Sequence, residues 1–245
     1  MCGSLPFRRL IYLLLNLRGL FNAGFPAVVI YILSTLTIIF LILPFHEWAH
    51  AFVASKLGDT SVKQRGRLSL NPMSHIDYMG ALFMLLFGFG WAKPVPVDDR
   101  RFKNPKLGMA ITAFAGPLAN VVAAFVGGLI YYAVVFAVYK TNPVLISTST
   151  ALAYFRLFIS FYISSNCMLA VFNLIPWPPL DGSKIVFPLL PDKWVHKFYQ
   201  YQQYFYIVLM VLLFTGILSA PINSLSNSLA GFVSDVCFMP FKAFL

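Results

Sequence analysis

Residues 46–50 of the chain read His-Glu-Trp-Ala-His, with two histidines four positions apart and a glutamate beside the first. On a helix, positions four apart lie on one face, so His46 and His50 can bind the same metal ion. Glu47 then lies close enough to activate a water as general base. The chain holds only four histidines and one glutamate, so a chance match is rare. The pattern therefore predicts a hydrolytic zinc site.

A catalytic zinc ion takes three protein ligands and keeps one position open, so the two histidines need a partner. The chain has no second glutamate, which leaves aspartate or histidine as the third ligand. The candidates are Asp59, His75, Asp77, Asp98, Asp99, Asp181, Asp192, His196 and Asp235. Asp181 stands out because closely spaced prolines precede it, and interrupted helices build polar sites inside membranes. On the residues alone, a plain loop aspartate or a helix N-cap explains Asp181 equally well.

The elements that position these residues must lie in a membrane. Hydrophobic residues make up 59% of the chain. Charged residues make up 11%, whereas about a quarter of the residues of a soluble domain are charged. The apolar runs are long and unbroken, which favours helices over a barrel. We therefore expect an all-α polytopic protein surrounded by a lipid bilayer. The net charge of +10 is typical of basic loops beside membrane spans, and we expect no nucleic-acid partner.

Apolar segments predict about four to six transmembrane helices. Four segments are long enough to span a bilayer, residues 26–57, 107–138, 150–175 and 201–218. Residues 80–91 are too short to cross and are expected to form a re-entrant loop. These features divide the chain into an N-terminal interfacial segment at 1–25, a catalytic core at 26–190 and C-terminal membrane segments at 191–245. Whether residues 10–25 and 221–245 span stays open.

Basic residues predict the orientation of the chain in the membrane. Residues 56–106 and 184–197 together hold twelve lysines and arginines, so we expect both segments on the cytoplasmic side. The arginines near the N-terminus fit this arrangement only if residues 10–25 cross the membrane.

Two motifs and three further segments resemble one family. The run HEWAH on an apolar helix, followed much later by NLIPWPPLDG, resembles the site-2 protease family of intramembrane zinc metalloproteases. The segments RLSLNPMSHIDYMG, GWAKPVPVDDRRFKNPKLGMA and FAGPLAN are similar to its compact prokaryotic branch. The resemblance covers about residues 27–190, and we expect no PDZ or CBS domain.

The resemblance implies a three-helix catalytic core with zinc held by His46, His50 and Asp181. It also implies Glu47 as general base and Asn173 as a polar group of the active site. Members of this family cleave transmembrane segments of other membrane proteins, in regulated intramembrane proteolysis. A multi-pass protein of a prokaryotic inner membrane is therefore expected, with transmembrane proteins as substrates. The oligomeric state stays open.

Two other functions and one substrate hypothesis accompany this prediction. A metal transporter would also carry buried histidine and aspartate, and a catalytically silent scaffold would keep the fold. Glu47 favours hydrolysis, because one glutamate beside two histidines suits water activation. The resemblance also implies that Asn120, in the run FAGPLAN, lies on a neighbouring core helix. We further consider that segment 59–69 or the run AKPVPV binds an unwound substrate by edge addition, although both segments also suit structural turns.

Overall fold

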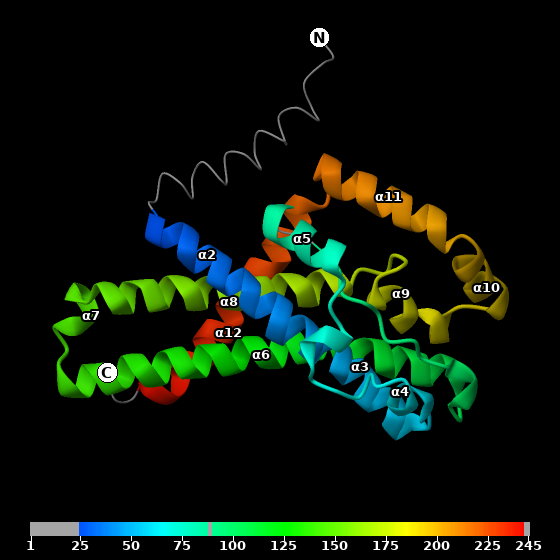
Figure 1. The fold of residues 1–245 in the computed structure, drawn as a ribbon, viewed down its shortest axis with the longest axis horizontal. Coiled ribbons are helices and arrows are strands. Elements are labelled where there is room, and N and C mark those ends of the chain that lie inside the picture. The colour runs from blue at the N-terminus through cyan, green and yellow to red at the C-terminus, as the bar shows by residue number, and fades with distance from the viewer. Residues whose placement is uncertain (1–24, 88–89, 243–245) are drawn as a thin grey trace, which may run out of the picture.

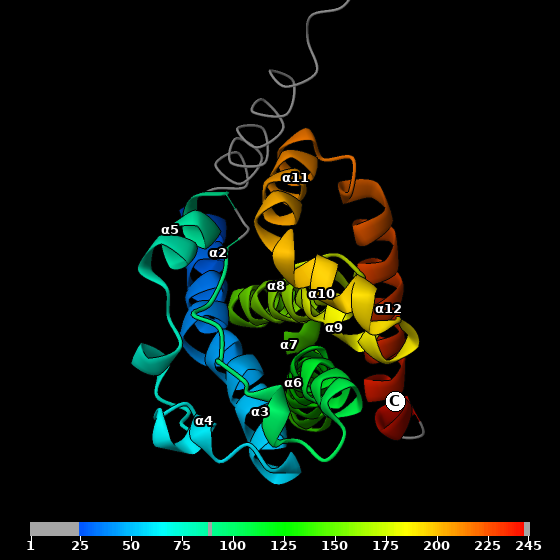
Figure 2. The ribbon, with the colours of Figure 1, turned by 90° about the vertical axis from the view of Figure 1, so that its right-hand side faces the viewer.

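The computed structural model describes residues 25–87 and 90–242, and within them all regular elements are helical. Helices α6 (Pro105–Thr141) and α8 (Thr150–Asn173) lie side by side along the long axis, joined through the short α7 (Leu145–Thr148) (Figure 1). The helix that runs from Phe25 to Leu57 packs on one side of this pair, and α12 (Ser219–Lys242) packs on the other (Figure 2). The α6–α8 pair is therefore the centre of the bundle.

The first helix combines α2 (Phe25–Thr37), a π-helical turn (Ile38–Ile42) and α3 (Leu43–Leu57). Its apolar residues around the π turn are buried in the main core against α6 and α8. The hydroxyls of Ser34 and Thr35 bond to carbonyls of the preceding turn, which satisfies polar groups in an apolar setting. Gly58, at φ 120°, ends α3.

Close packing around α6 depends on its small residues. The Asn104 side chain caps its first turn by accepting a hydrogen bond from the Leu107 N–H. Farther along, a Cβ on Gly127 would lie 2.6 Å from the Tyr162 ring, and one on Gly128 would lie 2.7 Å from Cys237 Sγ. Helices α8 and α12 can therefore approach α6 closely, as small residues allow in membrane bundles.

Three helical stretches are long and apolar enough to cross a membrane: Phe25–Leu57, Pro105–Thr141 and Thr150–Asn173. They agree with the predicted spans 26–57, 107–138 and 150–175. The predicted span 201–218 holds a shorter helix, α11 (Gln202–Thr215), because the left-handed Gly216 ends it. With 14 residues it is about 21 Å long, short of the hydrocarbon thickness. Helix α12 has the length but lacks the apolar composition.

The two ends of the predicted re-entrant loop at residues 80–91 lie against each other. Helix α5 (Tyr78–Phe87) forms the outward part. Gly80 packs directly against the Trp91 backbone, and Ile76 forms an antiparallel bridge with Ala92. Residues 88 and 89 lie outside the described part, as does the interfacial segment predicted before Phe25.

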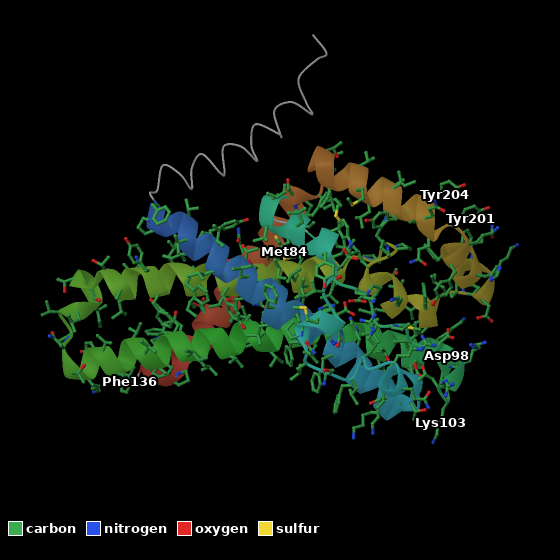
Figure 3. All side chains as sticks on the ribbon, viewed as in Figure 1. Met84, Asp98, Lys103, Phe136, Tyr201 and Tyr204 are labelled. Carbon is green, nitrogen blue, oxygen red and sulfur yellow. The ribbon has the colours of Figure 1, made fainter. Side chains whose placement is uncertain are left out.

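The remaining elements are short and gather at one end of the bundle. They comprise α4 (Ser61–Gln64), α9 (Asp181–Ile185), α10 (Asp192–Gln200) and the 3₁₀ turns Pro72–Ser74, Asp99–Arg101 and Phe187–Leu189. Asp98 and Lys103 mark this end, and Phe136 marks the opposite end of α6 (Figure 3). The basic segments 56–106 and 184–197 therefore share one end of the molecule.

Candidate metal centre

Three predicted ligands meet where α3 faces the start of α9. The Nε2 atoms of His46 and His50 lie 3.1 Å apart, and they lie 3.3 and 3.2 Å from Asp181 Oδ2. Zinc with bonds of about 2.0–2.1 Å to a tetrahedral donor set would separate these donors by about 3.3 Å. Two imidazole nitrogens and one carboxylate oxygen at this spacing fit a catalytic zinc ion and leave its fourth position open.

The other ring nitrogens orient the two imidazoles. His50 Nδ1 lies 2.7 Å from the Thr112 carbonyl, which can only accept, so Nδ1 carries the hydrogen and Nε2 keeps its lone pair. His46 Nδ1 lies 3.3 Å from Oδ1 of the fully buried Asn120. Both partners belong to α6, which therefore turns the two Nε2 atoms toward Asp181.

Gly116 lies between those two partners and lets α6 approach the imidazoles. Thr112, Gly116 and Asn120 are spaced by four and share one face of the helix. A Cβ on Gly116 would overlap the His50 ring and lie 2.6 Å from His46 Cε1. No residue with a side chain fits here without moving the histidines.

Asp181 is delivered by the break after α8. Leu180 is extended, α9 begins at Asp181, and Ser183 Oγ donates to the Leu180 carbonyl at 2.7 Å. A Cβ on Gly182 would lie 2.5 Å from the Leu174 carbonyl carbon, so the turn requires glycine there. Asp181 Oδ2 therefore faces both Nε2 atoms, and its carboxylate is the form of this side chain that binds a metal.

Glu47 is held by an extended segment that crosses the site. We call residues 92–98 the strap. Val95 N–H donates to Glu47 Oε2 at 3.0 Å. The neighbouring Pro94 and Pro96 have no N–H, and Lys93 N–H donates to the His75 carbonyl at 2.7 Å. The strap thus fixes the glutamate through one backbone donor.

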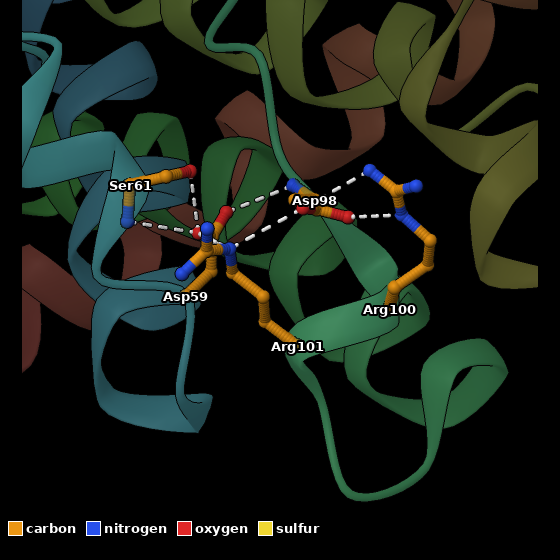
Figure 4. Close-up of polar contacts among 5 residues, drawn as sticks. All are labelled: Asp59, Ser61, Asp98, Arg100 and Arg101. Carbon is orange, nitrogen blue, oxygen red and sulfur yellow. Dashed lines mark hydrogen bonds and ion pairs between the residues drawn. The ribbon is translucent and has the colours of Figure 1, made fainter.

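A buried carboxylate ties the strap to the end of α3 (Figure 4). Asp59 is fully buried and accepts bonds from Ser61 N and Oγ at 3.0 and 2.6 Å, and from Asp98 N at 2.8 Å. Arg101 Nε lies 3.7 Å from Asp59, and a hydrogen bond from Arg100 lowers the pKa of Asp98. We call this group of five residues the clip. The clip holds Asp98, the last residue of the strap, three residues after Val95.

The metal ligands and Glu47 line a cavity of about 420 Å³. His46, Glu47, His50 and Asp181 lie in its wall, and so does Asn173, whose Nδ2 donates to the Leu169 carbonyl at 3.0 Å. An apolar cavity of about 170 Å³ adjoins it and shares three lining residues, Gly90, Leu169 and Phe172. The site therefore neighbours an apolar space between α5, α8 and the α11–α12 turn.

The other predicted candidates for the third ligand lie elsewhere. Asp59 and Asp98 belong to the clip, and His75 Nε2 donates to the Ser69 carbonyl at 2.7 Å. Asp77 accepts from Gly80 N–H, and Asp192 pairs with Lys106. Within residues 25–87 and 90–242, Asp99, His196 and Asp235 also join no group of three potential ligands.

Of the two interpretations of residues 59–69, the structure favours structural turns over a binding edge. Residues 61–64 form α4, and Arg65 and Gly66 continue it as hydrogen-bonded turns, so this segment offers no extended edge. The strap is extended, but hydrogen bonds already use the N–H groups of Lys93, Val95 and Asp98.

The sequence reasoning missed three groups that the structure brings to the site. Val95 and Thr112 contribute backbone atoms, for which side-chain types carry no signal. Tyr206 of α11 lines the cavity although it lies in an apolar segment that read only as a span. The spacing of Thr112, Gly116 and Asn120 by four is the one signal that could have marked the supporting face of α6.

Comparisons with known proteins agree with this geometry. Residues 34–217 match Peptidase family M50. YwhC of Bacillus subtilis, named as a candidate zinc metalloprotease, is 41% identical over 185 residues, 76% of this chain and 80% of that protein. Rip2 of Mycolicibacterium smegmatis is 28% identical over 71% of this chain and 64% of its own length. MJ0611 of Methanocaldococcus jannaschii is 31% identical over 58% of this chain and 63% of its own length. Both carry the same description. No solved structure matches the chain.

Proposed function

Because the chain belongs to Peptidase family M50 and is a zinc-dependent protease of the membrane, we propose that it cleaves other membrane proteins within or near their transmembrane segments. One observation carries this proposal. The cavity that holds His46, Glu47, His50 and Asp181 lies between helices long enough to span, and it adjoins an apolar cavity. The apolar cavity would offer a transmembrane segment a surface beside the catalytic residues.

The zinc ion would be held by His46, His50 and Asp181, in the donor arrangement described above. When bound, zinc supplies Lewis acidity, which makes an attacking water more acidic and a substrate carbonyl more electrophilic. The hydrogen bonds to Thr112 and Asn120 keep both Nε2 atoms available and limit rotation of the rings.

Glu47 would act as the general base. Val95 N–H holds one of its oxygens, which leaves the other to accept a proton from the attacking water and to pass it to the leaving amine. Asn173 would bind the substrate carbonyl through Nδ2. One of its two hydrogens bonds to the Leu169 carbonyl, which leaves the other for the substrate.

The substrate would lie against the strap as an unwound segment. A helix has its amides in internal hydrogen bonds, so the scissile region must open before it reaches Glu47. The strap has few donors left, and we infer that substrate N–H groups pair with strap carbonyls instead. The basic end of the bundle faces the cytoplasm of a prokaryotic cell in this proposal, with the chain in the inner membrane.

The test is cleavage of transmembrane reporter substrates by the purified, reconstituted protein. Glu47→Gln keeps the shape of the side chain but removes its basicity, so we expect cleavage to fall at least about a hundredfold. Zinc content should equal that of the wild type, and the surface variant Asp192→Asn should cleave normally. Cleavage by Glu47→Gln at the wild-type rate would contradict the assigned base. A preference for soluble unfolded proteins over all membrane reporters would contradict the substrate class.

A further inference from the structure

A second polar cavity lies far from the metal centre, between α6, α8 and α12. Its volume is about 340 Å³, within the range of ligand sites. Hydroxyl-bearing residues of all three helices line it around one cation, Arg156: Tyr131, Tyr132, Ser160, Ser164 and Ser234.

Arg156 differs from every other basic residue of the three candidate spans. Lys56, Lys106 and Lys140 each lie one residue from a helix end, whereas Arg156 is the seventh residue of α8. Lys56 and Lys140 lie over the rings of Phe52 and Phe136 at 5.5 and 5.4 Å, and Lys106 bonds to the Leu190 carbonyl and Asp192.

Among the described residues, Arg156 has no hydrogen bond, ion pair or ring contact. Asp235 follows Ser234 on α12 and acts electrostatically on Tyr132 of the cavity wall, yet it forms no ion pair with Arg156 in the described part of the chain. A guanidinium has five donors, and an unpaired one beside apolar helices is costly. The exposed guanidinium of Arg156 therefore has no anionic partner among the described residues.

The level of Arg156 in the membrane indicates where that anion comes from. Arg156 precedes Asn173 by 17 residues of one continuous helix, a distance of about 25 Å. A hydrocarbon core is about 30 Å thick, so the cavity lies almost one core thickness from the metal centre. Arg156 lies near the start of α8, next to α7, and α7 lies at the end of the molecule away from α4 and α10 (Figure 1). In the orientation proposed above, with the metal centre near the cytoplasmic boundary, the lipid phosphates of the opposite leaflet lie at this level.

The geometry points to a binding site for the phosphate group of an anionic phospholipid in the non-cytoplasmic leaflet. Arg156 would bind two phosphate oxygens with its planar fork, and the surrounding hydroxyls would donate to the others. Gly231 on α12 leaves room for the headgroup, because a Cβ there would meet nothing within 4 Å. The lipid would join α6, α8 and α12 at the end opposite the protease site.

The experiment measures binding of phosphatidylglycerol to the full-length protein, delipidated in detergent, by native mass spectrometry. Arg156→Gln should weaken binding at least about tenfold, because it removes a charge-assisted pair. Gly231→Phe should weaken it similarly by filling the cavity without changing charge. Lys140→Gln removes a cation from the same end and should stay within about twofold. Zinc content should be unchanged in all three, which excludes a collapsed fold.

Several results would overturn the assignment. Equal binding by Arg156→Gln and the wild type would remove the arginine from the site. Equal losses in Arg156→Gln and Lys140→Gln would reduce the effect to general charge. Displacement of the lipid by inorganic phosphate at the same concentration would assign the cavity to a free anion. If Arg156→Gln bound lipid normally but no longer crosslinked to an acidic membrane helix, the cavity would be assigned to a protein partner. None of these readouts depends on proteolysis.

Discussion

At the scale of single residues, Gly116 controls how close α6 comes to the metal ligands. Its backbone lies against both imidazoles, and the residues one turn away on either side bond to their Nδ1 atoms. The same helix therefore positions both rings and leaves no space between itself and them. A change of one methyl group tests this arrangement.

We expect Gly116→Ala to displace the histidines and to weaken zinc binding at least about tenfold. The new Cβ overlaps the His50 ring, and overpacking of this kind costs about 1–3 kcal/mol. Zinc titration of the purified variants measures the effect. Gly231→Ala is the matched control, since open space surrounds that glycine on another helix. Normal zinc affinity in Gly116→Ala would mean that α6 does not set the geometry of the rings.

Side-chain chemistry made part of this site predictable. His46, Glu47, His50 and Asp181 carry recognisable patterns, and the structure brings all four to one cavity. The contacts of Val95 and Thr112 were not predictable, because any residue except proline offers the same N–H and any residue the same carbonyl. Such contacts depend on where the backbone runs, which only the tertiary fold determines.

At the scale of elements, the clip and the strap act together. Asp59 lies two residues beyond the helix that carries Glu47, and it also fixes the strap whose Val95 N–H holds Glu47. Asp59 therefore positions both elements that the Val95–Glu47 hydrogen bond joins, the helix α3 and the strap. We regard Asp59 as a positioning residue, since it touches neither the metal ligands nor the cavity wall.

Asp59→Asn should loosen the strap and slow cleavage while zinc content stays normal. The amide places a donor opposite a donor, at either Ser61 or Asp98 N–H, and a buried unpaired donor costs about 1–3 kcal/mol. Hydrogen exchange over residues 92–98 should accelerate, and kcat should fall. Asp192→Asn, which alters an exposed ion pair, is the control. Slower cleavage with unchanged exchange in the strap would show that Asp59 acts by another route.

Element lengths were predictable only where apolar runs had clear ends. The three long spans are marked by glycine, proline or polar residues at their boundaries. The segment 201–218 was predicted too long because Gly216 lies inside an apolar run, and hydropathy does not register its left-handed backbone. Segment 59–69 stayed open between an edge and a turn because four residues are enough for the helical turn of α4, and so short a run has no visible period.

At the scale of the whole molecule, charge and chemistry share one end. The basic segments, the strap and the metal centre lie together, and the far end of α6 and α8 carries the cavity of Arg156. If the basic end faces the cytoplasm, proteolysis occurs toward that side of the membrane.

Single cysteines test this orientation in intact cells, after the native cysteines have been replaced. Lys103→Cys lies at the basic end, and Asn142→Cys follows α6 at the other end. A membrane-impermeant thiol reagent should label only Asn142→Cys from outside, and Lys103→Cys only after the cells are opened. The reverse labelling would invert the orientation and place the active site toward the outer face.

The most direct test of the account is the zinc content of the purified protein beside that of Asp181→Ala. The wild type should hold about one zinc ion per chain, and the variant should lose it, because two histidines alone do not hold a catalytic zinc firmly. Asp192→Ala, which removes an exposed aspartate, should retain the metal. Equal zinc in the wild type and Asp181→Ala would contradict the His46–His50–Asp181 centre and place the third ligand elsewhere.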